Sequence, residues 1–379
     1  MKKIKINSCY ISHFGRRTSD YLAITLEAVR AILSQRDPRR IERVYLASYA
    51  ASELCDIPDP FGGITRAIQS EFPELTASYH GLFKTGGEAL YRALVTMVED
   101  RLAEDGDVLV VGSEKMTHLD PGVAAGLLSS REHSLYRDYG ATLPALGALV
   151  THSYLREYDV PTHSLDWIAV KNHRHAALNP KAHFRNHVTA EEVATSPLVA
   201  DPLRRLHCAP MSDGAAAVLL SRKEGDVGFV GFAKGVDVPL FQERRNLARF
   251  VATARAGEAA RAQSRTTQRD IDIVEIHDAF SSFEMINLEE IGFYPHGHAW
   301  KALASGELGI NGKLAVNSSG GMKAKGHPIG ATGLSSCVEL HEQLTGAAGA
   351  RQHRGARLGM IQSAGGVSNE SYIFILDNA

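Results

Sequence analysis

Short runs of aliphatic and β-branched residues alternate with longer segments of helical character along most of this 379-residue chain. Strands that alternate with helices of a dozen residues are typical of a largely parallel sheet with crossover helices. The first part therefore predicts an α/β fold. Its expected elements are a strand at 4–11, a helix at 20–33, a strand at 44–48, a strand near 76–79, a helix at 86–102 and the apolar run DVLVVGSEKM.

A similar order of elements returns later in the chain, although the residues themselves do not visibly repeat. It comprises the runs GAAAVLLSR and GFVGFAKGV, a helix at 246–263, a strand at 271–277, a helix at 281–291, a strand at 314–317, a final helix, and the strands ARLGMIQSA and SYIFILD. Between the two parts the character changes, with one clear helix at 143–157 and the loop-like stretch HAALNPKAHFRN. We therefore predict an N-terminal half (1–116 plus 203–225), an inserted loop domain (117–202) and a C-terminal half (226–379).

Charge and cysteine content limit the kinds of partner and the cellular compartment that we expect. With 41 basic and 43 acidic residues the net charge is -2, which gives no general attraction to nucleic acid or to an anionic membrane. The four cysteines are scattered without C-x-x-C spacing, so we expect reduced thiols in a cytoplasm, and no metal site. The start, MKKIKINSCYISHFG, alternates as a strand does, and we expect neither a signal peptide nor a membrane span.

Five glycines surround one histidine in NSSGGMKAKGHPIGATGLSS. Pro328 suits the first position of a helix, which places His327 just before a helix N-terminus. Small residues at such a turn let the backbone approach a ligand and let the helix pack closely. A histidine there can donate a hydrogen bond to a developing oxyanion, although a packing histidine in a glycine-rich loop is an equal alternative from these residues alone.

The segment KLAVNSSGGMKAKGHPIGATG resembles the C-terminal signature of the thiolase superfamily. EIHDAFSSFE is similar to the H-D-A-F box of the sterol-carrier-type and archaeal thiolases, and GSEKM and CAPMSDGAAAVLL are similar to other segments of that subfamily. The resemblance covers nearly the whole chain. It implies the thiolase fold, in which two similar βαβαβαββ halves form five layers, α-β-α-β-α, with an inserted loop domain.

The resemblance also implies a site. His327 would polarise the carbonyl of an acyl thioester, and His277 would help hold a water or an oxyanion. For His277 the alternative is a strand-end histidine bonded to Asp278, and Asp278 or the pair Ser281 with Glu284 could simply cap the next helix. The expected pocket-lining residues are Asn317, Gly326, Gly365 and Gly366.

The implied substrate is a coenzyme A thioester or the phosphopantetheine thioester of an acyl carrier, with no bound cofactor. The family further implies a homodimer, or a heterodimer with another thiolase-like chain. Some members recruit a small OB-fold protein with a zinc ribbon.

The nucleophile of the family is missing from its expected place. Thiolases carry the acyl group on a cysteine in C-A-S-G-G-x-A-L, whereas this chain reads GLFKTGGEALYRAL, which puts Phe83 at that position. The second family cysteine, in C-x-G-G, becomes Ser363 in SAGG. None of the four cysteines lies within 20 residues of Phe83. Thr85 is expected to cap the following helix in a capping box with Glu88.

Three functions follow from these residues. The first is a thiolase-like enzyme that makes or breaks a carbon–carbon bond, or transfers an acyl group, through a His277 and His327 oxyanion pocket without a cysteine nucleophile. The second is a catalytically silent thiolase-like subunit or scaffold in a hetero-oligomer, with Phe83 as a plug. The third is a conventional acetyl-CoA acyltransferase whose nucleophile lies elsewhere. We favour the first, because both histidine motifs and the glycine turn are intact.

Overall fold

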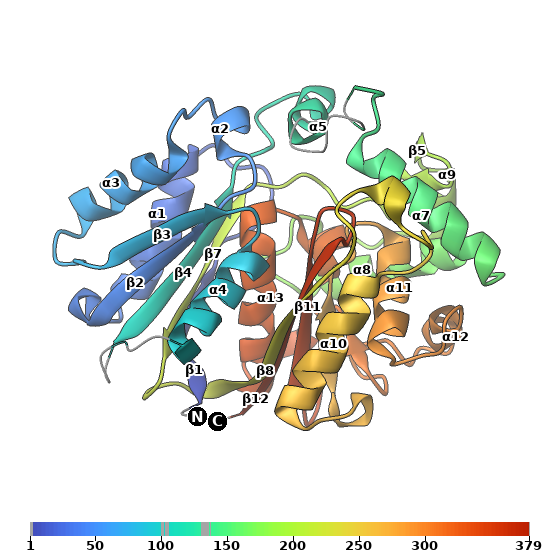
Figure 1. Cartoon of the computed structure of the whole chain (residues 1–379). Coiled ribbons are helices and arrows are strands. Elements are labelled where there is room, and N and C mark those ends of the chain that lie inside the picture. Colours follow the sequence, from blue (N-terminus) through green and yellow to red (C-terminus); the bar gives the residue numbers. More distant parts are fainter. Residues whose placement is uncertain (1–2, 100–101, 103–105, 130–135, 137, 379) are drawn as a thin grey trace.

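The computed structural model describes residues 3–99, 102, 106–129, 136 and 138–378 (Figure 1). Its large sheet consists of two five-stranded units with the same strand order. In the N-terminal unit the order is β3 (Ser78–Phe83), β2 (Ile41–Ala47), β4 (Asp107–Glu114), β7 (Gly214–Ser221) and β1 (Ile4–Ile11). In the C-terminal unit it is β10 (Ala315–Val316), β9 (Ile273–Ile276), β11 (Leu358–Gly365), β12 (Glu370–Asn378) and β8 (Val227–Val236).

Strand direction also matches between the two units. In each, the first three strands of the order are parallel, the fourth is antiparallel to the third, and the fifth is antiparallel to the fourth. The units join where Ile4–Ile6 of β1 pairs antiparallel with Val227–Phe229 of β8. The prediction of two similar α/β halves is therefore confirmed.

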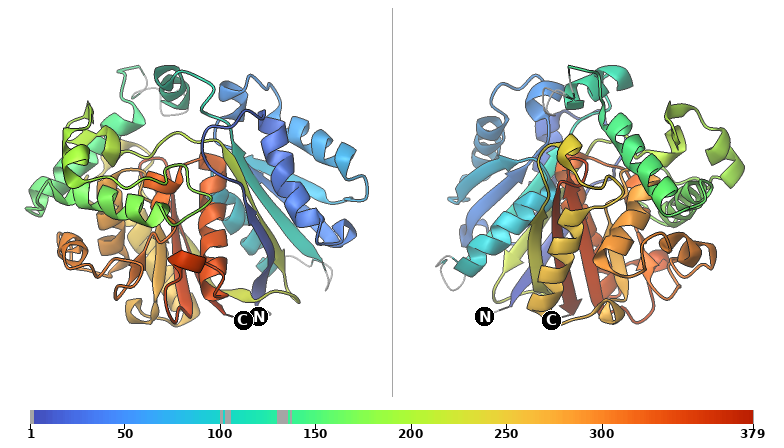
Figure 2. Two further views of the ribbon diagram at one scale, coloured as in Figure 1. Left: turned by 180° about the vertical axis from the view of Figure 1, so that it is seen from behind. Right: turned by 45° about the vertical axis from the view of Figure 1, so that its right-hand side comes forward.

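The helices form three layers around the two halves of the sheet (Figures 1 and 2). On the outer face of the N-terminal unit lie α1 (Tyr21–Leu33) and α3 (Pro60–Glu71), with the short α2 (Ala51–Leu54) at its edge. In the middle lie α4 (Gly86–Glu99) and α13 (Ile329–Leu344). On the outer face of the C-terminal unit lie α10 (Val251–Ser264) and α11 (Ser281–Ile291), with α12 (Ala299–Ala304) beside them.

Side-chain alternation along the strands explains these layers. On β7, Ala216, Val218 and Leu220 pack against the central helices, while the intervening Ala215, Ala217 and Leu219 pack against α1 and α3. All of β7 is buried, as expected for a strand covered on both faces. The two sheet units therefore lie between three helical layers, which confirms the predicted five-layered thiolase fold.

The central helices cross very closely because glycines lie at the contact. A Cβ on Gly333 of α13 would lie 2.4 Å from the backbone nitrogen of Gly87 on α4, and a Cβ on Gly330 would lie 2.6 Å from the carbonyl oxygen of Ser113. Such distances exclude any side chain larger than hydrogen. The glycines of the histidine turn thus serve helix packing, which brings the starts of α4 and α13 together.

Residues between β4 and β7 contain more regular structure than the one predicted helix. That helix, α7 (Leu143–Glu157), has the predicted bounds, but α5 (Pro121–Ser129), α8 (Ser164–Ala176), α9 (Ala190–Thr195), β5 (Leu198–Ala200) and β6 (Leu203–Arg204) accompany it. The buried face of α8 carries Lys171, Asn172, His173 and His175, so its polar sequence concealed a packed helix. The prediction of a single clear helix here was wrong.

Some boundaries differ from the prediction, as at β2, which begins at Ile41 rather than at residue 44. β3 runs from Ser78 to Phe83, whereas the sequence predicted a strand near 76–79. Gly81, whose φ is 44°, lies inside the strand and interrupts the pattern from which its C-terminal end could have been predicted. α10 begins at Val251, five residues later than predicted. α4 is described to Glu99, and residues 100 and 101 of the predicted helix lie outside the described residues. Within the described part of the chain, no helix combines the length and the apolar character needed to cross a membrane.

Candidate active site

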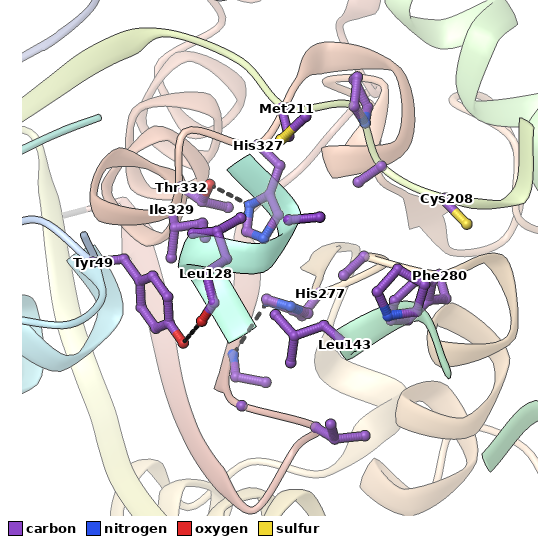
Figure 3. Close-up of a pocket in the computed structure, with 18 of the residues that line it drawn as sticks. Tyr49, Leu128, Leu143, Cys208, Met211, His277, Phe280, His327, Ile329 and Thr332 are labelled. Carbon is purple, nitrogen blue, oxygen red and sulfur yellow. Dashed lines mark hydrogen bonds between the residues drawn. The ribbon is translucent and has the colours of Figure 1, made fainter. Parts of the chain in front are cut away.

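A cavity of about 350 Å³ opens between the two halves, beside the N-termini of α4 and α13 (Figure 3). Its wall combines the ends of the two histidine motifs with apolar residues from the segment between β4 and β7. From that segment come Met116, Leu128, Leu143, Pro144 and Met211, and Phe280 of the H-D-A-F box adds a further apolar side chain. Such a cavity, apolar with a few polar groups, has the character of a small-molecule site.

His327 projects into this cavity from the turn before α13, which begins at Ile329, one residue later than predicted. Its Nδ1 lies 2.8 Å from Oγ1 of Thr332, and that hydroxyl donates its proton to the carbonyl oxygen of Pro328 at 2.9 Å. Since a hydroxyl has one proton, Thr332 must accept from Nδ1–H. The lone pair of His327 therefore lies on Nε2.

His277 has the opposite arrangement. It follows β9, and its Nδ1 accepts a hydrogen bond from the backbone N–H of Ala364 at 3.4 Å. In the neutral ring the proton then lies on Nε2. The rings of His277 and His327 lie 5.5 Å apart, centroid to centroid, and are nearly perpendicular at 89°. One histidine therefore offers the cavity a donor and the other an acceptor.

Burial keeps both rings neutral. Burial, followed by the nearby Lys325 ammonium, lowers the pKa of His327 to about 4. Burial, followed by the neighbouring His327, lowers the pKa of His277 well below its ordinary value. At neutral pH the pair is a hydrogen-bond donor beside a free base, without a positive charge.

Asp278 connects the two histidine segments. Its carboxylate accepts hydrogen bonds from the backbone N–H groups of Met322 at 2.6 Å and Lys323 at 3.3 Å, and from Nδ2 of Asn172 at 2.7 Å. The residue after His277 thus holds the π-helical turn at Gly321–Lys325, which leads to the second histidine. These contacts belong to that turn and to α8, and the alternative that Asp278 caps α11 was wrong.

Glu284 anchors the same region from α11. It accepts from Nδ2 of Asn172 at 2.9 Å and from Nδ2 of Asn317 at 2.8 Å, and it forms an ion pair with Lys171 at 3.0 Å. The side-chain oxygen of Asn317 accepts from the backbone N–H of Ile276 at 2.8 Å. Asn317 is therefore fully engaged behind the histidines, and the prediction that it lines the cavity was wrong. Burial and the adjacent Glu284 raise the pKa of Asp278 to about 7.

The other predicted lining residues are Gly326, Gly365 and Gly366, and Ser363 was predicted at the position of the second family cysteine; only some of these residues line the cavity. Gly366 and Ser363 lie on the cavity wall, and no hydrogen bond within the described residues engages the Ser363 hydroxyl. Gly326 and Gly365 do not lie on it. Gly326 has φ of 114°, and a Cβ there would lie 2.7 Å from Oγ of Ser212, so it serves the turn. Gly365 ends β11, where it pairs with Glu370.

Phe83, where the sequence led us to expect the family nucleophile, is the last residue of β3 and does not line the cavity. Its ring stacks on Tyr45 with centroids 6.0 Å apart, so it is not the plug considered from sequence. Two residues later Thr85 does line the cavity, and its Oγ1 accepts from the N–H of Glu88 at 3.1 Å, as a helix cap does. Glu88 reaches back to the N–H of Lys84 at 3.3 Å rather than to that of Thr85, so the capping box is shifted by one residue.

The cysteines offer no activated thiol. Cys208 lies on the cavity wall, a placement the sequence did not indicate, and burial raises its pKa to about 11. Burial raises the pKa of Cys9 and of Cys55 to about 12, and that of Cys337 well above its ordinary value. Because the thiolate is the nucleophile, none of these thiols is prepared for attack near neutral pH.

Glu114 is a further residue of the site that sequence reasoning missed. Its buried carboxylate accepts from the N–H of Gly330 at 3.0 Å, from Oγ of Ser48 at 2.8 Å and from the N–H of Tyr49 at 2.8 Å. It therefore ties the first turn of α13 to the loop after β2. Only its place in GSEKM, directly at the end of a buried strand, could have suggested this role.

Comparison with known proteins identifies the family. Residues 86–224 match the family described as thiolase, N-terminal domain, and residues 233–378 match thiolase C-terminal domain-like. An acetyl-CoA acetyltransferase of Methanothermobacter thermautotrophicus is 39% identical over 276 residues, which cover 71% of this chain and 72% of that protein. The chain belongs to the thiolase superfamily.

Human sterol carrier protein 2 is another relative within this superfamily, 33% identical over 302 residues. That match covers 74% of this chain and 54% of sterol carrier protein 2, so about half of the longer protein is matched. The N-terminal family match begins at Gly86, just after Phe83 and Thr85.

Two solved structures share the thiolase fold over the whole chain. The Ltp2-ChsH2(DUF35) aldolase superposes with a TM-score of 0.81 at 19% identity, covering 100% of this chain and 98% of that one. Human mitochondrial 3-ketoacyl-CoA thiolase superposes with a TM-score of 0.73 at 14% identity, covering 100% and 99%. These thiolase-fold neighbours establish the architecture, and the chemistry is argued from the site.

Proposed function

We propose that this protein is a carbon–carbon lyase that cleaves 3-hydroxyacyl thioesters by a retro-aldol reaction, with His327 as the base and His277 as the hydrogen-bond donor. The observation that carries the proposal is the opposite hydrogen-bonding state of the two neutral rings. Oγ1 of Thr332 leaves a lone pair on Nε2 of His327, and the N–H of Ala364 leaves a proton on Nε2 of His277. A retro-aldol reaction needs one group of each kind.

In this reaction Nε2 of His327 takes the proton of the substrate's 3-hydroxyl group. The C2–C3 bond breaks, the hydroxyl carbon becomes a ketone or aldehyde, and the electron pair forms the enolate of the remaining thioester. Nε2–H of His277 donates to the enolate oxygen. The His327 imidazolium then returns its proton to C2, which gives a shortened acyl thioester without any further co-substrate.

Among the described residues of the site, no activated thiol is placed for covalent acyl transfer. Phe83 has no lone pair and stacks away from the cavity, and Cys208 has a pKa raised to about 11. The hydroxyl of Thr85 accepts a hydrogen bond at the start of α4. A retro-Claisen cleavage needs a nucleophile at the carbonyl, whereas a retro-aldol cleavage needs none. The absence of an activated thiol therefore favours the lyase over a conventional acyltransferase.

Two further observations support an active enzyme. A silent subunit would not need an apolar cavity of about 350 Å³ with two oriented histidines on its wall. The Ltp2-ChsH2(DUF35) aldolase shares the fold over the whole chain, which makes aldol chemistry compatible with this architecture. The thioester carrier is coenzyme A in this proposal, as it is in the name of the archaeal acetyltransferase relative.

Product analysis tests the proposal. The purified protein is incubated with 3-hydroxyacyl-CoA esters, including ones with a branched C3, and products are identified by liquid chromatography and mass spectrometry. We expect equal amounts of a carbonyl compound and a shortened acyl-CoA without added free CoA. The variant His327→Asn should lose about 10²–10⁴-fold in kcat, and His277→Phe about 10²–10³-fold. Product formation that requires free CoA would contradict the lyase and restore the acyltransferase.

The proposal includes a protein partner. The Ltp2-ChsH2(DUF35) aldolase is named as an assembly of two proteins, which supports a search for a small partner of this chain, and the expected OB-fold and zinc-ribbon protein is the first candidate. Alone, the chain is expected to form a dimer. All four cysteines are unpaired, which supports a reducing, cytoplasmic setting. Light scattering of the purified chain measures the dimer, and a monomer would refute that part.

A further inference from the structure

We propose that Phe280 sets the size of the acyl group that the cavity accepts, and that Gly147 fixes the position of the Phe280 ring. This inference rests on the proposed function, because it assigns the apolar cavity to the acyl group. It concerns Phe280, which lies on the cavity wall, and Gly147, which lies behind it. Neither residue takes part in the proton transfers.

Phe280 lies between the cavity and α7. Its side chain lines the cavity together with Leu143 and Pro144 from the start of α7, and only 8% of the residue is exposed (Figure 3). The ring packs edge to face on Phe283, with centroids 5.1 Å apart. Phe283 is in turn held by Phe250 at 4.8 Å. The ring therefore has a packed neighbour on one side and open space on the cavity side.

Gly147 supports the ring from behind. It is a buried glycine within α7 and does not line the cavity. A Cβ at Gly147 would lie 2.5 Å from Cε2 and 2.6 Å from Cδ2 of Phe280. The ring thus rests directly on the backbone of α7, in space that any other residue at position 147 would occupy.

Helix α7 cannot easily step back to make room. Oγ1 of Thr151, one turn after Gly147, lies 2.7 Å from Oγ of Ser282 on α11. One turn further on, the hydroxyl of Tyr154 donates to Oε1 of Glu289 at 2.8 Å. These buried bonds fix α7 against α11, so a methyl group at position 147 must displace the Phe280 ring toward the cavity.

The consequence is a change in acyl size with opposite sign in two variants. Gly147→Ala should push the ring into the cavity and reduce the space for the acyl group. Phe280→Leu, which keeps an apolar side chain on the wall, should enlarge that space. Gly126→Ala is the matched control, because it is also a glycine in a helix of the same segment and a Cβ there meets nothing within 4 Å.

Calorimetric binding of saturated, unreactive acyl-CoA esters of increasing length and of one bulky ring ester tests this inference. For Gly147→Ala we expect the Kd of the largest bound ester to rise at least about 10-fold, a loss of roughly 1.4 kcal/mol, with the Kd of acetyl-CoA unchanged. Phe280→Leu should shift the preferred ester to a larger one, and Gly126→Ala should resemble the wild type. Thermal unfolding checks that each variant is folded.

The outcomes separate this inference from the proposed function. An unchanged size preference in both Gly147→Ala and Phe280→Leu overturns the inference, as does an equal weakening for all esters. A size preference that shifts as expected, together with no turnover of 3-hydroxyacyl esters, supports the inference and refutes the lyase. If the wild type binds none of the esters, both proposals fail.

Discussion

Replacing Thr332 by valine should disable His327 without removing its ring. Valine keeps the shape of threonine but lacks the hydroxyl that accepts from Nδ1 at 2.8 Å and donates to the Pro328 carbonyl at 2.9 Å. Without that acceptor, the Nδ1-protonated tautomer of His327 is no longer favoured. A fraction of the rings then carries the proton on Nε2, where the substrate needs a lone pair.

The size of the effect follows from the hydrogen bonds lost. A buried donor left unpaired costs about 1–3 kcal/mol, and about 1.4 kcal/mol corresponds to a factor of ten in rate. We therefore expect kcat for retro-aldol cleavage to fall about 10- to 100-fold in Thr332→Val. The free energy of unfolding should fall by about 1–3 kcal/mol for the same reason. Initial rates of carbonyl release and urea denaturation measure the two quantities.

Two control variants separate the effect on the His327 tautomer from a general effect on helix α13. Thr332→Ser keeps the hydroxyl and should retain most of the activity. Thr345→Val removes a similar bond, from Oγ1 to the His341 carbonyl at 2.7 Å, at the exposed end of α13 and should leave kcat unchanged. The reasoning is refuted if Thr332→Val keeps the wild-type kcat, or if Thr332→Ser loses as much as Thr332→Val.

Three other predictions follow from the same structure. Burial and Lys325 lower the pKa of His327 to about 4, so the ring is unprotonated above that pH. We therefore expect kcat/KM to stay constant from pH 8 to about pH 5 and to fall only at lower pH. A fall in kcat/KM centred near pH 6.5 would contradict this. Gly330→Ala should lower the free energy of unfolding by about 3 kcal/mol or more, since the new Cβ would lie 2.6 Å from the Ser113 carbonyl oxygen. An unchanged midpoint of urea denaturation would contradict this, because it would mean that the backbone shifts without cost. Asn172→Leu removes the hydrogen-bond donor that the buried Asp278 and Glu284 carboxylates share, and it should lower the free energy of unfolding by about 3 kcal/mol in denaturation measurements. Leu178→Asn, at an exposed site, is the comparison. Equal stability of the two variants would refute the role of Asn172.

Much of the fold follows from local sequence patterns. Buried strands such as β4 and β7 are continuous apolar runs, and α11 spans the residues that its pattern predicts. Such patterns fail where tertiary contacts replace local preference. Helix α8 contains Lys171, Asn172, His173 and His175 on its buried face, because the carboxylates and carbonyls that they bind come from other parts of the chain.

The site, too, was predictable where it depends on local segments and not where it depends on long-range contacts. The histidine turn and the H-D-A-F box could be found because each is a continuous segment with an unusual composition. The hydrogen bonds that choose the tautomers of His277 and His327 were not predictable, since one of them joins residues 87 positions apart. Asn317 was misplaced for a related reason, because its partner Glu284 lies 33 positions away, in helix α11.

The central claim is that the C2–C3 bond of the acyl thioester is cleaved without an acyl-enzyme. Intact-protein mass spectrometry of the wild type, quenched with acid during turnover of a 3-hydroxyacyl-CoA ester, tests it most directly. The account predicts the unmodified mass of the chain at every time point while carbonyl compound and shortened acyl-CoA accumulate. A protein mass increased by one acyl group, appearing and decaying at the rate of turnover, would contradict it.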